Sequence, residues 1–256
     1  MKERDVAIIG GGFAGLFAAV VCAKNNKKVT VFLYGSGAFP LNSGLIDILG
    51  YDEARTLVKD PLAAIESLPA EHPYHRIGKK SIEEAADFFL KFMEEEGFPY
   101  YGSLSEQQFA VTPVGTLKPS CLVPASMRTP DLAGKDIVIV GVRGLKDFYP
   151  EMLAANLADT LGEGARIRTV ELDPGASHER DLSILDAARW LEGDGSTLVS
   201  RRLAAEDGAG RVFIFPQILG VRGQRVYKKI QAAMKGTIIE TTAMPPSANG
   251  MRLRDV

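Results

Sequence analysis

The chain has 256 residues, 46% of them hydrophobic and 24% charged, which is typical of a folded globular protein. Its formal net charge of -2 at pH 7 gives no bulk attraction to nucleic acid, and we expect no nucleic-acid partner. The two cysteines, Cys22 and Cys121, have no CxxC spacing, so the sequence predicts no disulfide framework and fits a reducing compartment best. The three histidines are too scattered to predict a metal site: His72, His75 and His178.

The chain begins with an 18-residue run, residues 6–23, that carries no charged side chain. That length permits a membrane span or a signal sequence, but four glycines interrupt the run and residues 2–5 carry both signs of charge. We therefore expect a buried strand over residues 6–9, a glycine turn, a helix over residues 13–24 and a second strand over residues 28–33. Together these elements form a nucleotide-binding βαβ unit.

The rest of the chain alternates helical and strand patterns and predicts an α/β protein. A Gly- and Pro-rich extended region at residues 97–130 marks a second domain or insertion. Residues 250–256 are typical of the opening of another structured element, so we expect the sequence to end before its fold does. Further helices are expected at residues 82–95, 150–161, 183–191, 197–205 and 224–235, and further strands at residues 136–142, 166–170, 211–215 and 237–240.

The glycine turn has the spacing of a dinucleotide-binding fingerprint, because Gly10-x-Gly12-x-x-Gly15 follows a strand and opens a helix. Gly10 permits the tight turn, Gly12 lets the backbone approach a phosphate, and Gly15 lets helix and strand pack closely. The helix start, at Phe13 and Ala14, then presents free N–H groups to the anion. The alternative is a tight turn that binds no ligand.

The second strand ends without the acid that a dinucleotide site normally uses. An Asp or Glu about twenty residues farther on usually binds a ribose hydroxyl, and Leu33 or Tyr34 occupies that position here. The missing carboxylate disfavours NAD and an ordinary FAD site. It favours FMN, which has a phosphate but no adenosine ribose. FMN is therefore the expected cofactor, with FAD as the alternative if backbone or serine groups replace the carboxylate.

Ser43 and Gly44 follow the second strand by a short loop. A small polar residue beside a glycine is suited to approach a cofactor phosphate or the isoalloxazine edge of a flavin. The same segment also fits a helix N-cap, formed by Ser43 with Asp47. The sequence leaves both interpretations open.

Several segments, taken in chain order, resemble the B subunit of the anaerobic glycerol-3-phosphate dehydrogenases. They are the glycine turn, Ser43-Gly44-x-x-Asp47, His72-Pro73-Tyr74, and the segments TPVGTLK, GVRGLKDF and PPSANGMRL at residues 112–118, 141–148 and 245–253. The resemblance spans essentially the whole chain, and this ordered set is far more specific than a glycine fingerprint alone.

The resemblance implies a Rossmann-like FAD/NAD(P)-binding fold, of the glutathione-reductase-like flavoprotein type, with an inserted second α/β domain. Residues 1–50 are expected to form the N-terminal part of the flavin domain. Residues 51–256 are expected to form the second domain, which binds substrate or a partner or acts as a cap. Members of the family normally continue well beyond this chain's end, so the C-terminal part of the flavin domain is expected to be missing.

The resemblance also implies a function. Such proteins, usually described with FMN, work beside an FAD-containing A subunit of the same complex and an iron-sulfur C subunit that docks at the membrane. Together they oxidise glycerol 3-phosphate to dihydroxyacetone phosphate and send electrons toward quinone. The expected location is therefore cytoplasmic, at the inner face of the cell membrane, where the partner subunits hold the protein peripherally.

Four side chains are candidates for the chemistry of such an enzyme. His72 or His75 is a candidate base for the hydroxyl proton, and Lys118 or Arg143 a candidate clamp for the substrate phosphate. Each has a structural alternative. The histidines can simply satisfy hydrogen bonds, the segment around Lys118 can define a turn, and the glycines around Arg143 can serve sheet-to-helix packing.

Two other functions stay open from the sequence. A self-contained FAD- or NAD-dependent oxidoreductase fits the glycine fingerprint, but the missing ribose acid disfavours it. A cofactor-free assembly protein or truncated remnant would keep the glycine turn for packing alone.

Overall fold

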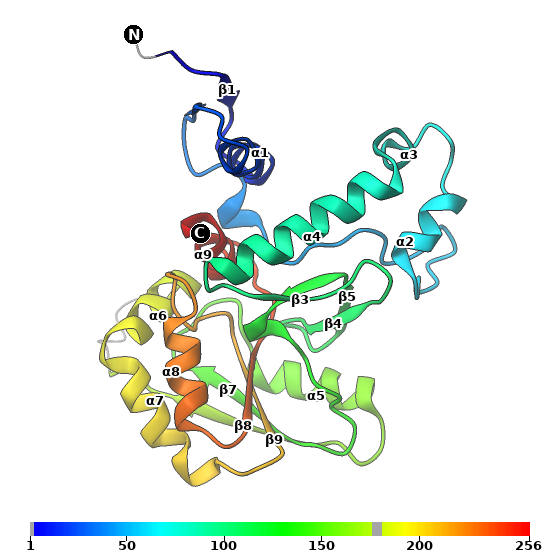
Figure 1. The fold of residues 1–256 in the computed structure, drawn as a ribbon. Coiled ribbons are helices and arrows are strands. Elements are labelled where there is room, and N and C mark those ends of the chain that lie inside the picture. Colours follow the sequence, from blue (N-terminus) through cyan, green and yellow to red (C-terminus); the bar gives the residue numbers. More distant parts are fainter. Residues whose placement is uncertain (1–2, 176–180) are drawn as a thin grey trace.

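The computed structural model describes residues 3–175 and 181–256 (Figure 1). His178, one of the three scattered histidines, lies outside the described residues. The strands are β1 (Val6–Ile9), β2 (Val29–Phe32), β3 (Tyr100–Gly102), β4 (Gln108–Val111), β5 (Leu117–Ser120), β6 (Leu122–Pro124), β7 (Asp136–Val142), β8 (Arg166–Leu172), β9 (Arg211–Phe215) and β10 (Thr237–Glu240). The α-helices are α1 (Phe13–Lys24), α2 (Pro61–Ala64), α3 (Pro73–Ile77), α4 (Lys79–Glu95), α5 (Pro150–Leu161), α6 (Ile184–Trp190), α7 (Ser196–Leu203), α8 (Arg225–Ala233) and α9 (Ala248–Asp255). Single helical turns, most of them 3-10, occur at η1 (Phe39–Leu41), η2 (Ile65–Ser67), η3 (Ala125–Met127), η4 (Leu191–Gly195) and η5 (Ala204–Glu206).

The βαβ unit predicted at the start of the chain is present. β1 and β2 pair in parallel, from Val6 opposite Val29 to Ile9 opposite Phe32, and α1 connects them. Among the described strands, these two pair only with each other. Figure 1 shows β1 and α1 at the periphery, away from the larger sheet. The pair is open to solvent at the end of β1, where Ile9 is 91% exposed.

The larger sheet has four parallel strands in the order β10-β9-β7-β8. Residues 137–140 of β7 are fully buried and apolar, as expected for a central parallel strand that helices cover on both faces. α5 lies on one side of the sheet, and α7 and α8 lie on the other (Figure 1). The strand order reverses between β7 and β9. That switch point is where open α/β sheets place ligands, beyond the carboxyl ends of the strands.

An ion cluster ties three strands together at the amino end of this sheet. Asp136, the first residue of β7, accepts hydrogen bonds from Arg168 Nη1 at 2.8 Å and from Arg211 Nε at 2.9 Å. Arg168 also donates from Nη2 to Glu206 Oε2 at 2.8 Å. Desolvation alone raises the pKa of Asp136, but the two arginines outweigh it and hold that pKa below its ordinary value of 3.8.

Asp136→Asn is expected to destabilise the protein at neutral pH and to have less effect in acid. Because the folded-state pKa is the lower one, the stabilisation is present above the unfolded-state pKa, near 3.8. It is lost as the pH falls through the folded-state pKa. Urea denaturation of the parent chain and of Asp136→Asn, at about pH 7 and at about pH 3, measures this stabilisation. The difference in free energy of unfolding between the two proteins should be smaller at the lower pH. A difference of constant size would contradict the prediction.

A second apolar cluster lies under α1, and α4 contributes one of its faces to it. Ile82, Phe89 and Met93 are the buried residues of α4 and share one face at helical spacing. The ring centroids of Phe13 and Phe17 lie 6.0 Å and 6.1 Å from that of Phe89. Two antiparallel pairs, β3 with β6 and β4 with β5, make up much of the region predicted as extended.

The structure differs from the sequence prediction in local detail. α4 begins at Lys79 rather than at residue 82, and β8 continues to Leu172 rather than residue 170. The short helices α2 and α3 were not expected. Each spans about one turn, which is too short for helical periodicity to register in a sequence.

The mixed α/β class is confirmed, and the C-terminal segment predicted to be structured forms α9. α9 returns to the beginning of the chain. Ser247 N donates to Pro40 O at 2.7 Å, and a Cβ at Gly250 would lie 1.9 Å from Phe39 O. Leu253 joins the apolar cluster under α1. The domain division at residue 50 and the inserted second domain therefore stay predictions, since α9 packs with residues of the first fifty.

Candidate functional site

The glycine turn between β1 and α1 has the tight geometry that its sequence predicts. Gly10 has a φ of +117°, a left-handed conformation that favours glycine, and its N–H donates to Phe32 O at 2.8 Å. A Cβ at Gly15 would lie 2.0 Å from Gly10 O. Position 15 therefore accepts glycine alone, because helix and turn are in contact there.

The start of α1 fits a phosphate group. Gly12 is the N-cap residue and no side chain caps the helix, while the bond from Leu16 N to Gly12 O, at 3.0 Å, closes the first turn. The N–H groups of Phe13, Ala14 and Gly15 precede that bond, and a Cβ at Gly12 would meet no atom within 4 Å. An anion can therefore approach the backbone here and meet the positive end of the helix dipole.

The chain after β2 supplies no carboxylate at the position where a dinucleotide site needs one. Leu33 is 53% exposed and Tyr34 is fully exposed. The chain then folds back onto the glycine turn, because a Cβ at Gly37 would lie 2.7 Å from the Cα of Gly12. The loop of residues 34–37 therefore forms one wall of the candidate phosphate site.

Ser43 and Gly44 lie in a loop and not at a helix start. The Asn42 side chain accepts from Gly44 N at 2.6 Å, and Ser43 Oγ accepts from Leu45 N at 3.3 Å. The N-cap interpretation of Ser43 and Asp47 is wrong, since no helix begins there and Asp47 pairs instead with Lys118. The Asn42 and Ser43 side chains accept hydrogen bonds from backbone N–H groups two residues farther on. Such bonds compete with helical hydrogen bonds and stabilise a loop instead.

α9 packs directly on the Ser43–Gly44 loop. Gly44 has a φ of +84°, and a Cβ there would lie 1.7 Å from Asn249 Nδ2. Tyr100 donates its buried hydroxyl to Gly44 O at 2.7 Å, and burial raises the pKa of this phenol. Ser247 caps α9 and donates from Oγ to Gln217 Oε1 at 2.8 Å. Two segments that are far apart in sequence therefore form one side of the site.

A buried ion pair occupies the carboxyl end of the four-stranded sheet. Arg252 donates from Nη1 to Glu240 Oε2 at 2.6 Å and from Nη2 to Glu240 Oε1 at 2.8 Å. Its Nε donates to Gly220 O at 2.7 Å, and Glu240 Oε1 also accepts from Leu219 N at 2.7 Å. The side chain of Arg252 thus donates hydrogen bonds to the Glu240 carboxylate and to the Gly220 carbonyl beyond the ends of the strands. This place lies beside the switch point where related sheets bind a ligand.

Both candidate histidines have structural partners on or near α3. His72 is the N-cap residue of that helix and its Nδ1 accepts from Tyr74 N at 3.2 Å. His75 Nε2 lies 3.0 Å from Leu68 O. Figure 1 shows α3 beside the start of α4, away from α1 and the glycine turn. Their role as catalytic bases stays a prediction, and the structure does not bring them to that turn.

The two candidate phosphate clamps lie in different parts of the fold. Lys118 pairs with Asp47 and so lies near the Ser43–Gly44 loop. Arg143 follows β7 and bonds Glu171 at 3.0 Å and Asp173 at 2.8 Å, and these carboxylates raise its pKa. The alternatives are partly settled, because residues 112–116 form the β4–β5 turn and Lys118 itself lies in β5, opposite Ala110. A Cβ at Gly141 would also lie 2.7 Å from Pro150, which is the packing role expected of that glycine.

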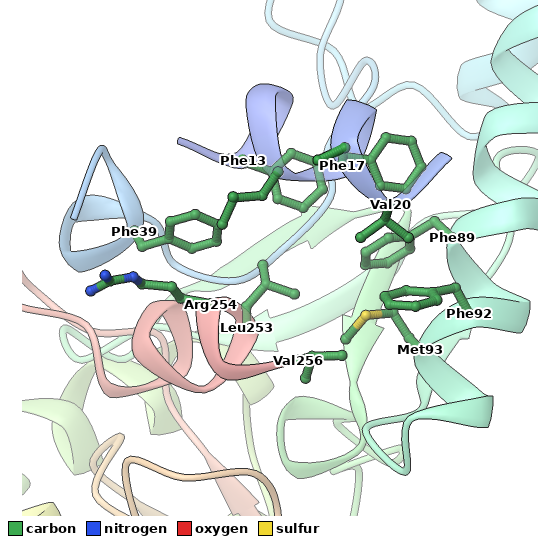
Figure 2. A pocket seen from close by; sticks show the side chains of 12 residues that line it. Phe13, Phe17, Val20, Phe39, Phe89, Phe92, Met93, Leu253, Arg254 and Val256 are labelled. Carbon is green, nitrogen blue, oxygen red and sulfur yellow. The ribbon is translucent and has the colours of Figure 1, made fainter. Parts of the chain in front are cut away.

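An apolar cavity of about 270 Å³ lies beneath α1 (Figure 2). α1 contributes Phe13 and Phe17, α4 contributes Phe89, and α9 contributes Leu253. Arg254 lines the same cavity, but Figure 2 shows its guanidinium directed away from the aromatic rings and past Phe39. Aromatic and aliphatic side chains dominate this space, so it continues the apolar cluster under the helix.

Across residues 3–175 and 181–256, no helix is both long enough and apolar enough to cross a membrane. Over the same ranges, no group of three or more His, Cys, Asp or Glu side chains is placed to hold a metal ion.

The comparison with protein families decides the class of protein. The model of a family described as an FAD binding domain matches residues 5–256. This chain belongs to that family. The match covers the glycine turn, the Ser43–Gly44 loop and α9 together, so a flavin is the cofactor of the fold, and FAD is the direct meaning of the family's description. The preference for FMN over FAD, which rested on Leu33 and Tyr34, is not confirmed.

Curated relatives support the resemblance seen in the sequence segments. The B subunit of the anaerobic glycerol-3-phosphate dehydrogenase of Glaesserella parasuis is 30% identical over 267 residues, which are 97% of this chain and 61% of the relative. Proteins of the same name from Pasteurella multocida and Haemophilus influenzae are each 29% identical and cover 97% and 98% of this chain. The chain spans about three fifths of the length of these relatives. None of the solved structures matches it.

Sequence reasoning missed the residues of this FAD-binding domain that act across long separations. Tyr100, Glu240 and Asn249 meet the Ser43–Gly44 loop or support α9. Only Asn249 belongs to a segment singled out in the sequence, PPSANGMRL, and nothing in that segment indicated its contact with Gly44. One signal was available for Glu240, since a carboxylate at the end of an apolar strand such as TIIE requires a buried partner.

Proposed function

We propose that the chain is the flavin-binding part of the B subunit of an anaerobic glycerol-3-phosphate dehydrogenase. The glycine turn carries this proposal, because its backbone is open at Gly12 and the helix start presents free N–H groups. The chain belongs to an FAD-binding family, and its similarity to curated proteins of that name extends along 97% of its length. Both observations support this function over a self-contained oxidoreductase or a cofactor-free assembly protein.

The proposed reaction is the oxidation of glycerol 3-phosphate to dihydroxyacetone phosphate, with electrons passed toward quinone. A bound flavin would supply the redox chemistry by accepting two electrons from the alcohol carbon. In this proposal an FAD-containing A subunit of the complex and an iron-sulfur C subunit complete the enzyme and hold it peripherally at the inner, cytoplasmic face of the membrane. The role of this chain is to bind the flavin phosphate at the start of α1 and to orient the ring by the Ser43–Gly44 loop.

FMN is the cofactor that we propose, with FAD as the alternative. Leu33 and Tyr34 give an adenosine ribose no carboxylate acceptor, and FMN needs none. FAD follows from the description of the family. Both flavins have the phosphate that the glycine turn fits, so the turn itself does not separate them.

The catalytic roles of individual side chains also stay proposals. Lys118 is the better candidate for a substrate phosphate, since its ion pair with Asp47 links it to the Ser43–Gly44 loop. Arg143 is already bound to two carboxylates. His72 and His75 remain the candidate bases, and both would have to leave their present partners to act.

The purified chain, reconstituted separately with FMN and with FAD, tests the proposal. We expect a stoichiometric flavin spectrum with FMN, and chromatography of the acid-released cofactor should identify it. Binding of FAD alone would support the family assignment and reject the preference for FMN. Failure to bind either flavin would contradict the proposed function. Bleaching of the bound flavin by glycerol 3-phosphate would show that this chain contributes the substrate site.

A further inference from the structure

Arg254 lies on the helix that returns to the glycine turn. α9 is fixed to the segment after β2 by the bond from Ser247 N to Pro40 O, at 2.7 Å, and by the close approach of Gly250 to Phe39 O. From the last turn of α9, Arg254 Nη1 donates to Ser36 Oγ at 3.1 Å. The guanidinium thus reaches the loop of residues 34–37 that forms a wall of the phosphate site.

That loop brings the guanidinium close to the start of α1. The residue after Ser36 is Gly37, where a Cβ would lie 2.8 Å from Gly12 N and 2.9 Å from Gly11 O. Ser36 and Gly37 are neighbours in the chain, so one short loop contacts both the Arg254 guanidinium and the backbone of the glycine turn.

The charge of Arg254 is not neutralised within the described residues. Arg143, Arg168, Arg211 and Arg252 each form an ion pair with Asp or Glu, whereas no ion pair among the described residues involves Arg254. The side chain is half-buried at the edge of an apolar cavity, and its hydrogen bond goes to a neutral hydroxyl. A guanidinium in such a place gains more from an anion than a fully solvated one, and its planar fork suits phosphate oxygens.

We propose that Arg254 binds the phosphate of the flavin held at the glycine turn, together with the backbone N–H groups of α1. The ligand class is a flavin phosphate, either the single phosphate of FMN or the pyrophosphate of FAD. The assignment rests on the flavin binding proposed above, and it adds a charged side chain to that site. Ser36 has the role of a positioning residue, since it holds the guanidinium toward the turn.

Flavin titrations of Arg254→Gln test this assignment, followed by flavin fluorescence with FMN, FAD and riboflavin. A charge-assisted hydrogen bond contributes about 1.5–3 kcal/mol, so the Kd for FMN or FAD should rise about 10-fold or more. The Kd for riboflavin, which has no phosphate, should stay unchanged. Arg254→Lys should recover part of the loss. Arg222→Gln is the matched control, because that exposed arginine uses only its main-chain N–H in the described hydrogen bond.

The outcomes separate this assignment from the proposed function. A parent chain that binds no flavin overturns both. A parent chain that binds FMN or FAD, with Arg254→Gln binding equally well, overturns the role of Arg254 alone. An equal loss for riboflavin also overturns it, since the side chain would then act on the fold rather than on the phosphate. Thermal unfolding without flavin should give the same Tm for Arg254→Gln and Arg222→Gln within a few degrees.

Discussion

Gly12→Val is expected to raise the Kd for FMN and for FAD at least about 100-fold while leaving the chain folded, since two or more charge-assisted bonds to the phosphate are lost. Gly12 has an extended backbone that any residue adopts, and a Cβ there would meet no atom within 4 Å. The added methyl groups therefore fill the space where the phosphate approaches and touch no protein atom at Cβ. The stability cost is that of a poor N-cap residue, about 1 kcal/mol. Fluorescence titration and thermal unfolding measure the two effects.

Two matched variants show whether the effect belongs to the phosphate site. Ala18→Val changes an exposed residue of the same helix and should leave the flavin Kd unaltered. Gly15→Ala should lose stability and binding together, because its Cβ would lie 2.0 Å from Gly10 O. If Gly12→Val kept the flavin affinity of the parent, the phosphate would bind elsewhere.

Arg252→Ala is expected to be the most destabilising single substitution outside the glycine turn. Both side chains of the pair are essentially unexposed, so the variant leaves the Glu240 carboxylate buried with a single hydrogen-bond donor at Leu219. Breaking such a pair costs about 3–5 kcal/mol, which in a chain of this length lowers Tm by roughly 6–20 °C. Flavin binding should weaken as well, since α9 would lose its main attachment to the sheet.

A double replacement separates an uncompensated charge from lost packing. Arg252→Met with Glu240→Leu should recover part of the lost Tm, because no buried charge is then left without a partner. Lys80→Ala breaks the exposed pair with Glu84 and should leave Tm nearly unchanged. Equal Tm values for Arg252→Ala and Lys80→Ala would contradict the central role of the buried pair.

The elements that form from near neighbours were predictable from the sequence. The apolar run of β7, the glycines between β1 and α1, and the Ser183–Asp186 capping box of α6 all specify structure within a few residues. The tight geometry of the glycine turn was predictable for the same reason, since Gly10, Gly12 and Gly15 lie within six positions. Prediction failed for the one-turn helices. It left two interpretations open for Ser43, because an N-cap and a loop share the same residue preferences.

Taken alone, the sequence determined the α/β class, the βαβ unit, the glycine turn and the missing acid at Leu33 and Tyr34. Only the tertiary structure decided what closes the site, because that depends on contacts between residues about two hundred positions apart. Asn249 against Gly44 and Arg254 against Ser36 are such contacts, and α9 makes both. The same is true of the pair that Arg252 forms with Glu240, whose energy arises from burial. Burial is a property of the folded chain, and no short motif records it.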